Sequence, residues 1–197
     1  MAQDRQMQQT TSSQGLKARD FATLGIFSSL WFVLTMVVGV LTTNPLVLMP
    51  WAPAICALVG GPIYMLMVAK VHKRGAVIIP ALVVGIVWAV MGGIPVLIAM
   101  AVAGVIGEAI VARTGYKSFS AIVVAYVIFV LAYHLGSTSY AWFFTDFMEQ
   151  VSSYPPEMVQ QVIAVVQSPN GYLSFAGAFF GRAVLRKHFV AAGIVRA

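Results

Sequence analysis

Charged residues are scarce in this chain. Asp, Glu, Lys and Arg make up 9% of its 197 residues, whereas 60% are apolar. Soluble domains carry about a quarter charged residues, so this composition excludes an ordinary soluble domain. The net charge of +6 does not indicate nucleic-acid binding, because the cations lie at the ends of apolar runs rather than in one patch.

Catalytic and metal-binding motifs are also missing. The chain has no G-x-x-x-x-G-K-[ST] loop, no H-E-x-x-H helix and no paired cysteines, and its single cysteine, Cys56, lies inside an apolar run. The apolar segments contain one carboxylate, Glu108, and one imidazole, His134, which we expect in opposite halves of the membrane. We therefore expect no catalytic residue, no metal site, no cofactor and no enzymatic activity.

Apolar segments long enough to span a membrane are abundant. A span needs about 20 residues, and we predict an all-α integral membrane protein with six transmembrane helices. Their approximate ranges are 21–41, 46–71, 76–91, 94–112, 119–142 and 172–187. The second segment contains Pro50, Pro53, Gly60, Gly61 and Pro62, so we expect it to be kinked or to start irregularly.

The basic residues fix the predicted orientation, because Lys and Arg gather in cytoplasmic loops. They occur before the first segment, between the second and third, between the fourth and fifth, and from the sixth segment onwards: Arg5, Lys17, Arg19, Lys70, Lys73, Arg74, Arg113, Lys117, Arg182, Arg186, Lys187 and Arg196. The other three connections contain neither residue type. Both termini are predicted to be cytoplasmic.

We expect the chain to divide into a disordered cytoplasmic tail (1–15), a transmembrane domain (16–190) and a short cytoplasmic tail (191–197). An external loop over about 143–171 contains Pro155-Pro156-Glu157, which suits a helix start, and Ser168-Pro169-Asn170-Gly171, which suits a turn. Between them an apolar stripe at helical spacing predicts a short amphipathic helix: Met158, Val159, Val162, Ile163, Val165 and Val166. This helix either lies on lipid headgroups or covers an outward-facing pocket.

Small residues recur on one face of the first segment, at Ala18, Ala22, Gly25 and Ser29. Small residues at this spacing let another helix approach closely. The partner is either a helix of the same bundle or another protein.

Candidate ligand residues are polar or aromatic side chains expected in the outer half of the membrane, where a mostly apolar pocket needs a few converging polar groups. They are Asn44, Trp51, Trp88, Tyr133, His134, Ser137, Tyr140, Trp142, Asn170 and Tyr172. For Trp51, Tyr140, Trp142 and Tyr172 the alternative is the aromatic belt at the membrane surface.

His134 and Glu108 are the ionisable residues of the apolar segments. His134 either bonds to a neighbouring helix, through Ser137 or Tyr133, or contacts a ligand, by hydrogen bonding or as an axial ligand of a haem-like molecule. Glu108 is expected to have a structural role near the inner boundary, beside Arg113 or Lys117.

Four stretches carry a resemblance to a known family. They are residues 16–30 (LKARDFATLGIFSSL), 49–53 (MPWAP) with 60–63 (GGPI), the Gly-rich end of the third segment, and 104–118 (GVIGEAIVARTGYKS). In this order and spacing the chain resembles the MptD-type, or Trep_Strep, family of putative substrate-binding S-components of energy-coupling factor (ECF) transporters. The resemblance covers most of the chain.

The resemblance implies a multi-pass protein of a prokaryotic cytoplasmic membrane that captures a vitamin or another scarce nutrient from outside. It implies docking on a T-component driven by two ATPase subunits, with Ala18, Ala22, Gly25 and Ser29 as the docking face. Two other functions remain open from the residues themselves: a non-transporting membrane scaffold, and a stand-alone secondary transporter, which the scarcity of intramembrane acids disfavours.

Overall fold

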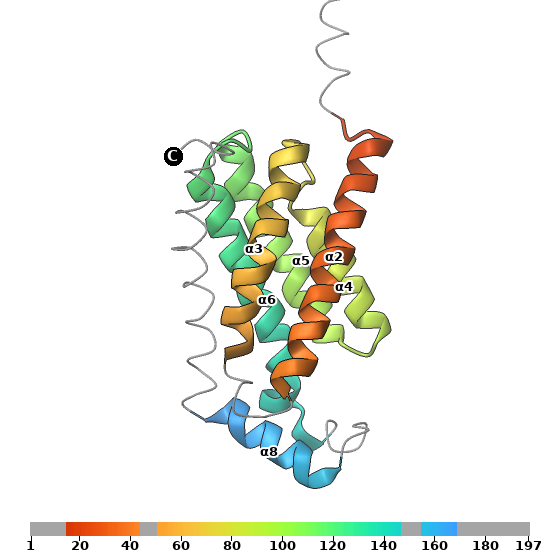
Figure 1. Cartoon of the computed structure of the whole chain (residues 1–197), viewed down its shortest axis with the longest axis vertical. Helices are drawn as coiled ribbons and strands as arrows, with labels where there is room; N and C mark the ends of the chain where they lie inside the picture. The colour runs from red at the N-terminus through yellow and green to blue at the C-terminus, as the bar shows by residue number, and fades with distance from the viewer. Residues whose placement is uncertain (1–14, 44–50, 147–154, 169–197) are drawn as a thin grey trace, which may run out of the picture.

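The computed structural model of the chain describes residues 15–43, 51–146 and 155–168, and within these ranges it is entirely helical (Figure 1). The helices are α2 (Ala18–Thr43), α3 (Ala52–Val71), α4 (Ile78–Val90), α5 (Ile94–Arg113), α6 (Phe119–Phe143) and α8 (Pro156–Gln167). The predicted tails at 1–14 and 191–197, and the sixth predicted span at 172–187, lie outside the described residues.

Three of these helices are long and apolar enough to cross a membrane: α2, α5 and α6. Of the other two apolar helices, α4 is shorter than predicted. α4 has 13 residues and therefore a length of about 20 Å, against an apolar bilayer thickness of about 30 Å. α3 begins at Ala52 and runs unbroken through Gly60, Gly61 and Pro62, while the irregular start expected before it falls partly on 44–50, outside the described residues.

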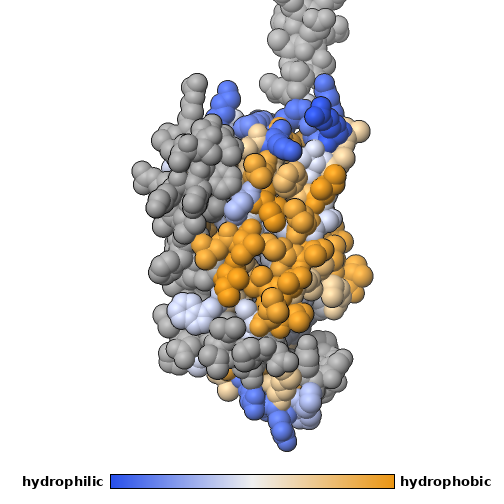
Figure 2. Space-filling view, in the orientation of Figure 1, coloured by the Kyte–Doolittle hydropathy of each residue, from blue (hydrophilic) through white to orange (hydrophobic). Residues whose placement is uncertain are grey.

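Helices α2 to α6 run roughly along the long axis of the molecule, and α8 lies across one end of the bundle (Figure 1). α6 forms the centre. It packs against α3, α5 and α8, and thirteen of its residues are buried. An apolar surface covers the middle of the visible face, and hydrophilic residues lie at both ends (Figure 2). This distribution is what an all-helical membrane protein requires, because lipid contacts the middle of the bundle and water contacts its two ends.

Glycine permits close contacts between the helices. A Cβ atom at Gly136 in α6 would lie 2.6 Å from the Cα of Val96 in α5, and one at Gly104 would lie 3.0 Å from the Cβ of Ala81 in α4. In α5, the small residues Ala103, Gly104 and Gly107 are buried and Ala101 is partly buried, as the sequence of small residues in this segment predicts for internal packing.

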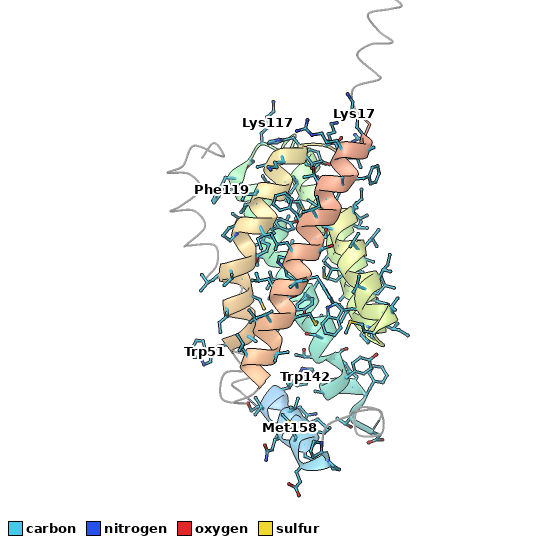
Figure 3. All side chains as sticks on the ribbon, turned by 45° about the vertical axis from the view of Figure 1, so that its right-hand side comes forward. Lys17, Trp51, Lys117, Phe119, Trp142 and Met158 are labelled. Atoms are coloured by element: carbon cyan, nitrogen blue, oxygen red, sulfur yellow. The ribbon has the colours of Figure 1, made fainter. Side chains whose placement is uncertain are left out.

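The described basic residues gather at one end of the bundle. Lys17 and Lys117 lie at the same end in Figure 3, opposite Trp51, Trp142 and Met158. At the basic end, Lys73 in the α3–α4 loop forms an ion pair of 2.7 Å with Asp20 in the first turn of α2. The described basic connections therefore lie at one end of the bundle, as predicted. The assignment of this end to the cytoplasm stays a prediction.

Candidate binding site in the bundle interior

A continuous series of seven aromatic rings fills the centre of the bundle, and we call it the ring cluster. Neighbouring centroids in the series lie 4.8 to 6.2 Å apart. The rings come from α2, α3, α4 and α6, in the contact order Tyr126, Tyr64, Phe129, Trp31, Tyr133, Trp88 and Phe32. Side chains from four different helices therefore pack together in one cluster.

Three polar atoms of the ring cluster are buried without a hydrogen-bond partner among the described residues. They are the indole nitrogens of Trp31 and Trp88 and the hydroxyl of Tyr64. The Tyr126 and Tyr133 hydroxyls lie near these two indole groups, but the geometry does not complete a hydrogen bond. Buried polar groups are nearly always paired, so each such exception needs an explanation.

The other polar groups nearby are satisfied locally. The Tyr126 hydroxyl donates to the backbone carbonyls of Cys56 (3.2 Å) and Ala57 (3.0 Å) in α3. The hydroxyls of Ser28 and Thr35 donate to carbonyls of their own helix, at 2.6 Å and 2.8 Å. The two indole nitrogens and the Tyr64 hydroxyl are therefore the exceptions among the described polar groups of the ring cluster.

The position of Trp31 depends on a glycine in the facing helix. A Cβ atom at Gly60 would lie 2.5 Å from the indole nitrogen of Trp31 and 3.0 Å from the Tyr126 hydroxyl oxygen. A void of about 10 Å³ lies beside Trp31, Tyr64 and Phe129. The cluster is thus closely packed, with space for at most one water molecule.

Two of the residues proposed from the sequence, Trp88 and Tyr133, lie in the ring cluster, with their centroids 5.9 Å apart. Trp51 does not join them. It precedes α3, is 60% exposed, and points away from the bundle in Figure 3. Asn44, Asn170 and Tyr172 lie outside the described residues.

The remaining candidates lie further along α6. The Ser137 hydroxyl donates to the backbone carbonyl of His134 at 3.0 Å, so its partner is this carbonyl and not the imidazole. His134 itself is partly buried, one position after Tyr133. The Tyr140 hydroxyl donates to the carbonyl of Gly92 at 2.6 Å and so ties the end of α6 to the turn between α4 and α5.

Trp142 lies where α8 meets α6. It packs against a small apolar cluster formed by Ala141 of α6 with Val159, Ile163 and Val166 of α8. The Gln167 amide also donates to the Ala141 carbonyl at 2.6 Å. The predicted amphipathic helix is confirmed as a helix, and its buried stripe rests on protein.

Sequence reasoning missed the other five residues of the ring cluster: Trp31, Phe32, Tyr64, Tyr126 and Phe129. A signal was available for Trp31, because tryptophan in membrane proteins is enriched at the two interfaces, whereas Trp31 lies in the middle of an apolar segment. The two tyrosines and Phe129 had no such signal, since their burial depends on which helices become neighbours.

The small-residue face of α2 is not covered by the described helices. Ala18, Ala22 and Ser29 are exposed and Gly25 is partly exposed. A Cβ atom added at Gly25 would meet nothing within 4 Å. Packing inside the described part of the bundle therefore does not account for these residues.

Glu108 joins two loops at the basic end of the bundle. Its carboxylate accepts hydrogen bonds from the backbone amides of Gly75 (2.7 Å), Val77 (3.0 Å) and Ile78 (3.2 Å), and from the Tyr116 hydroxyl. Burial and the hydrogen bond to Glu108 raise the pKa of Tyr116. These bonds are consistent with the structural role expected for Glu108, but its partners are these amides and Tyr116 and not Arg113 or Lys117.

A second hollow lies on the surface between α5 and α6. This groove has a volume of about 780 Å³, and its lining is apolar, including Ile98, Val102, Leu135, Phe143 and Phe144. No group of three or more His, Cys, Asp or Glu side chains that could hold a metal ion occurs in the described ranges.

Comparison with protein families gives one match. The model of a family described as hypothetical bacterial integral membrane protein (Trep_Strep) matches residues 18–190. No curated protein and no solved structure matches the chain.

Proposed function

The chain belongs to the Trep_Strep family of hypothetical bacterial integral membrane proteins, and on this premise we propose that it is the substrate-capture S-component of an ECF-type importer. In this role it is a multi-pass protein of the bacterial cytoplasmic membrane. It binds a vitamin or another scarce nutrient from outside and carries out no catalysis. Delivery proceeds through a T-component driven by two ATPase subunits.

The observation that carries this proposal is the uncovered small-residue face of α2. Glycines elsewhere in the bundle, such as Gly104, Gly107 and Gly136, each contact a neighbouring helix within 3.0 Å of an added Cβ atom. Gly25 contacts none, and Ala18, Ala22 and Ser29 beside it are exposed. Small residues that form a smooth face allow a second helix to approach closely, so this face suits docking of a T-component.

The proposed site of capture is the ring cluster. It supplies an apolar environment with a few polar groups, which is the usual composition of small-molecule sites. Trp88 and Tyr133 are the candidate contacts retained from the sequence, and Trp31 is added to them. His134 stays a candidate because it neighbours Tyr133 on α6.

The docking face is tested by an affinity-tagged chain expressed in its own host. We expect the T-component and both ATPases to co-purify with the native chain. Ala22→Trp should reduce their recovery at least about tenfold, because the indole keeps the approaching helix away from the small-residue face. The matched control is Ala109→Trp, which adds the same side chain at another exposed alanine, on α5.

Equal recovery of the partners with both variants would contradict docking through α2. Recovery of stable partners other than a T-component and ATPases, with no bound small molecule, would instead favour the scaffold function. Both variants should elute as monodisperse protein in detergent, so that a loss of partners is not confused with a loss of folding.

A further inference from the structure

The groove between α5 and α6 is an open hollow of about 780 Å³ on the side of the bundle. Its described lining residues all lie on these two helices or directly after α6, and none comes from α2, α3, α4 or α8. We infer that this groove binds one acyl chain of a phospholipid whose headgroup carries an ammonium group. The site is separate from the ring cluster and from the small-residue face of α2, so it does not depend on the proposed function.

Small side chains create the hollow between two close contacts of α5 and α6. At Gly107 of α5, an added Cβ atom would lie 3.3 Å from the Cβ of Ala125 in α6. At Gly136 of α6, an added Cβ atom would lie 2.6 Å from the Cα of Val96 in α5. Between these contacts the lining includes three alanines: Ala99, Ala103 and Ala132. The space between the two helices is therefore left open where the side chains are short.

The length of the groove matches one leaflet of a membrane. Along α5 the groove runs from Pro95 to Ile106, a rise of about 17 Å. The apolar core of a bilayer is about 30 Å thick, so one leaflet contributes about 15 Å. The groove covers the half of α5 that is nearer to the α8 end of the bundle (Figure 1). A helix that crosses the membrane is about twice as long as this groove, so the groove suits an acyl chain better than a spanning helix.

The lining suits a hydrocarbon chain and offers nothing to a polar ligand. No described lining residue is charged, and the hydroxyl of Ser139 donates to the carbonyl of Gly136 at 2.6 Å. Ile98, Leu135 and Phe143 are each more than half exposed, so they present apolar surface to a molecule in the groove. A hydrocarbon chain makes dispersion contacts with such walls and brings no polar group that would be left unpaired.

The charges at the α8 end determine which headgroup fits. Asp146 follows the lining residue Phe144 by two positions and is exposed, and Glu157 lies in the first turn of α8. The sequence contains no Lys or Arg between Lys117 and Arg182, and the α4–α5 turn contains none either. An anionic headgroup at this end would meet carboxylates without a cation, whereas an ammonium group meets the opposite charge. The groove therefore favours phosphatidylethanolamine over phosphatidylglycerol.

Native mass spectrometry tests this site on the full-length protein, delipidated in detergent and then given equal amounts of phosphatidylethanolamine and phosphatidylglycerol. Ala99→Phe and Ala132→Phe each place a ring in the groove, from α5 and from α6 respectively. The matched control is Ala109→Phe, which makes the same change at an exposed alanine of α5 that does not line the groove.

We expect the native protein to retain one molecule of phosphatidylethanolamine. Its retention should fall at least about fivefold in Ala99→Phe and in Ala132→Phe, because the ring removes the dispersion contacts between the chain and the groove walls. It should be unchanged in Ala109→Phe. Phosphatidylglycerol is attracted to Lys and Arg at the basic end, so its retention should be equal in all four proteins. Equal retention of this second lipid, with equal melting temperatures, shows that the groove variants are folded.

Equal retention of phosphatidylethanolamine by the native protein and both groove variants would overturn the inference, because the lipid would then bind elsewhere. A preference of the groove for phosphatidylglycerol would overturn the assignment of the headgroup. Loss of a co-purified protein from the groove variants, with unchanged lipid retention, would assign the groove to a partner helix instead. The native protein also gives a result without any variant, since failure to retain phosphatidylethanolamine at one molecule per chain rejects the site.

Discussion

At the scale of single residues, Glu108 connects the two described loops of the basic end. Its three amide partners lie in the α3–α4 loop and the first turn of α4, and its fourth partner, Tyr116, lies in the α5–α6 loop. Tyr116 has a backbone φ of +61°, a conformation that costs a non-glycine residue energy. The hydrogen bond to Glu108 helps to hold Tyr116 in this conformation.

We predict that Glu108→Gln lowers stability and folding yield more than ligand affinity. Glutamine keeps one acceptor oxygen but turns an NH₂ group toward backbone amides that also donate. The expected loss is about 1–3 kcal/mol, the usual result of leaving a buried partner unsatisfied. Thermal unfolding followed by size-exclusion chromatography in detergent measures it.

Tyr116→Phe is the graded control for this prediction. It removes one donor and leaves the three amide bonds to the carboxylate, so its effect on the melting temperature should be smaller than that of Glu108→Gln. A large loss of ligand affinity in Glu108→Gln, with normal expression and melting temperature, would refute the structural role.

Some residues could be singled out from sequence because of their type and their position in an apolar run. Glu108 was expected to be structural because it lies near the inner boundary of its apolar segment, close to Arg113 and Lys117. Trp88 and Tyr133 were expected near a ligand because they are aromatic residues of the outer half. The partners of Glu108 could not be foreseen, because Gly75 and Tyr116 reach it only after α4, α5 and the two loops have packed.

At the scale of elements, the contact between α5 and α6 is set by Gly136. The Cβ position of this residue lies 2.6 Å from the Cα and 3.1 Å from the backbone nitrogen of Val96, and 3.2 Å from the Pro95 carbonyl oxygen. These are backbone atoms, so they cannot move aside as the end of a flexible side chain can. The two helices therefore require glycine at this crossing.

We predict that Gly136→Ala destabilises the protein by about 1–3 kcal/mol, the usual cost of overpacking, because the added methyl group forces α5 and α6 apart. The control is Gly39→Ala, in α2, where an added Cβ meets nothing within 4 Å. Alanine favours a helix over glycine by up to about 1 kcal/mol, so this control should be neutral or stabilising. Equal melting temperatures for the two variants would contradict the role of Gly136.

The helix α8 was foreseen as an element but not in its contacts. Its proline-rich start and apolar stripe follow from local sequence, whereas the burial of Val159, Ile163 and Val166 against Ala141 depends on where α6 ends. The stripe lies on protein, so contact with lipid headgroups does not by itself explain it. A covering function over the end of the bundle stays a hypothesis.

At the scale of the whole molecule, orientation in the membrane is the main prediction that follows from charge. Cytoplasmic loops are enriched in Lys and Arg, and the described basic loops share one end of the bundle, opposite α8 (Figure 3). We therefore expect the α5–α6 loop inside the cell and α8 outside.

Cysteine labelling in intact cells tests this orientation. Cys56 is the single native cysteine and is buried, so a Cys56→Ser background is suitable. A membrane-impermeant maleimide should label Glu157→Cys in α8, and it should label Lys117→Cys only after the cells are permeabilised. Labelling of Lys117→Cys in intact cells would reverse the proposed orientation.

The sequence by itself determined that this is a helical membrane protein with its basic loops on one side. Those properties depend on composition, segment length and the position of charges, and each can be evaluated without knowing which helices touch. Only the tertiary structure shows which residues form the ring cluster, that the small-residue face of α2 is not covered by the described helices, and which groups bond to Glu108. Apolar segments look alike in sequence whether they face lipid or protein, because both environments are apolar, so the choice between them is made by side-chain fit at particular residues such as Gly60 and Gly136.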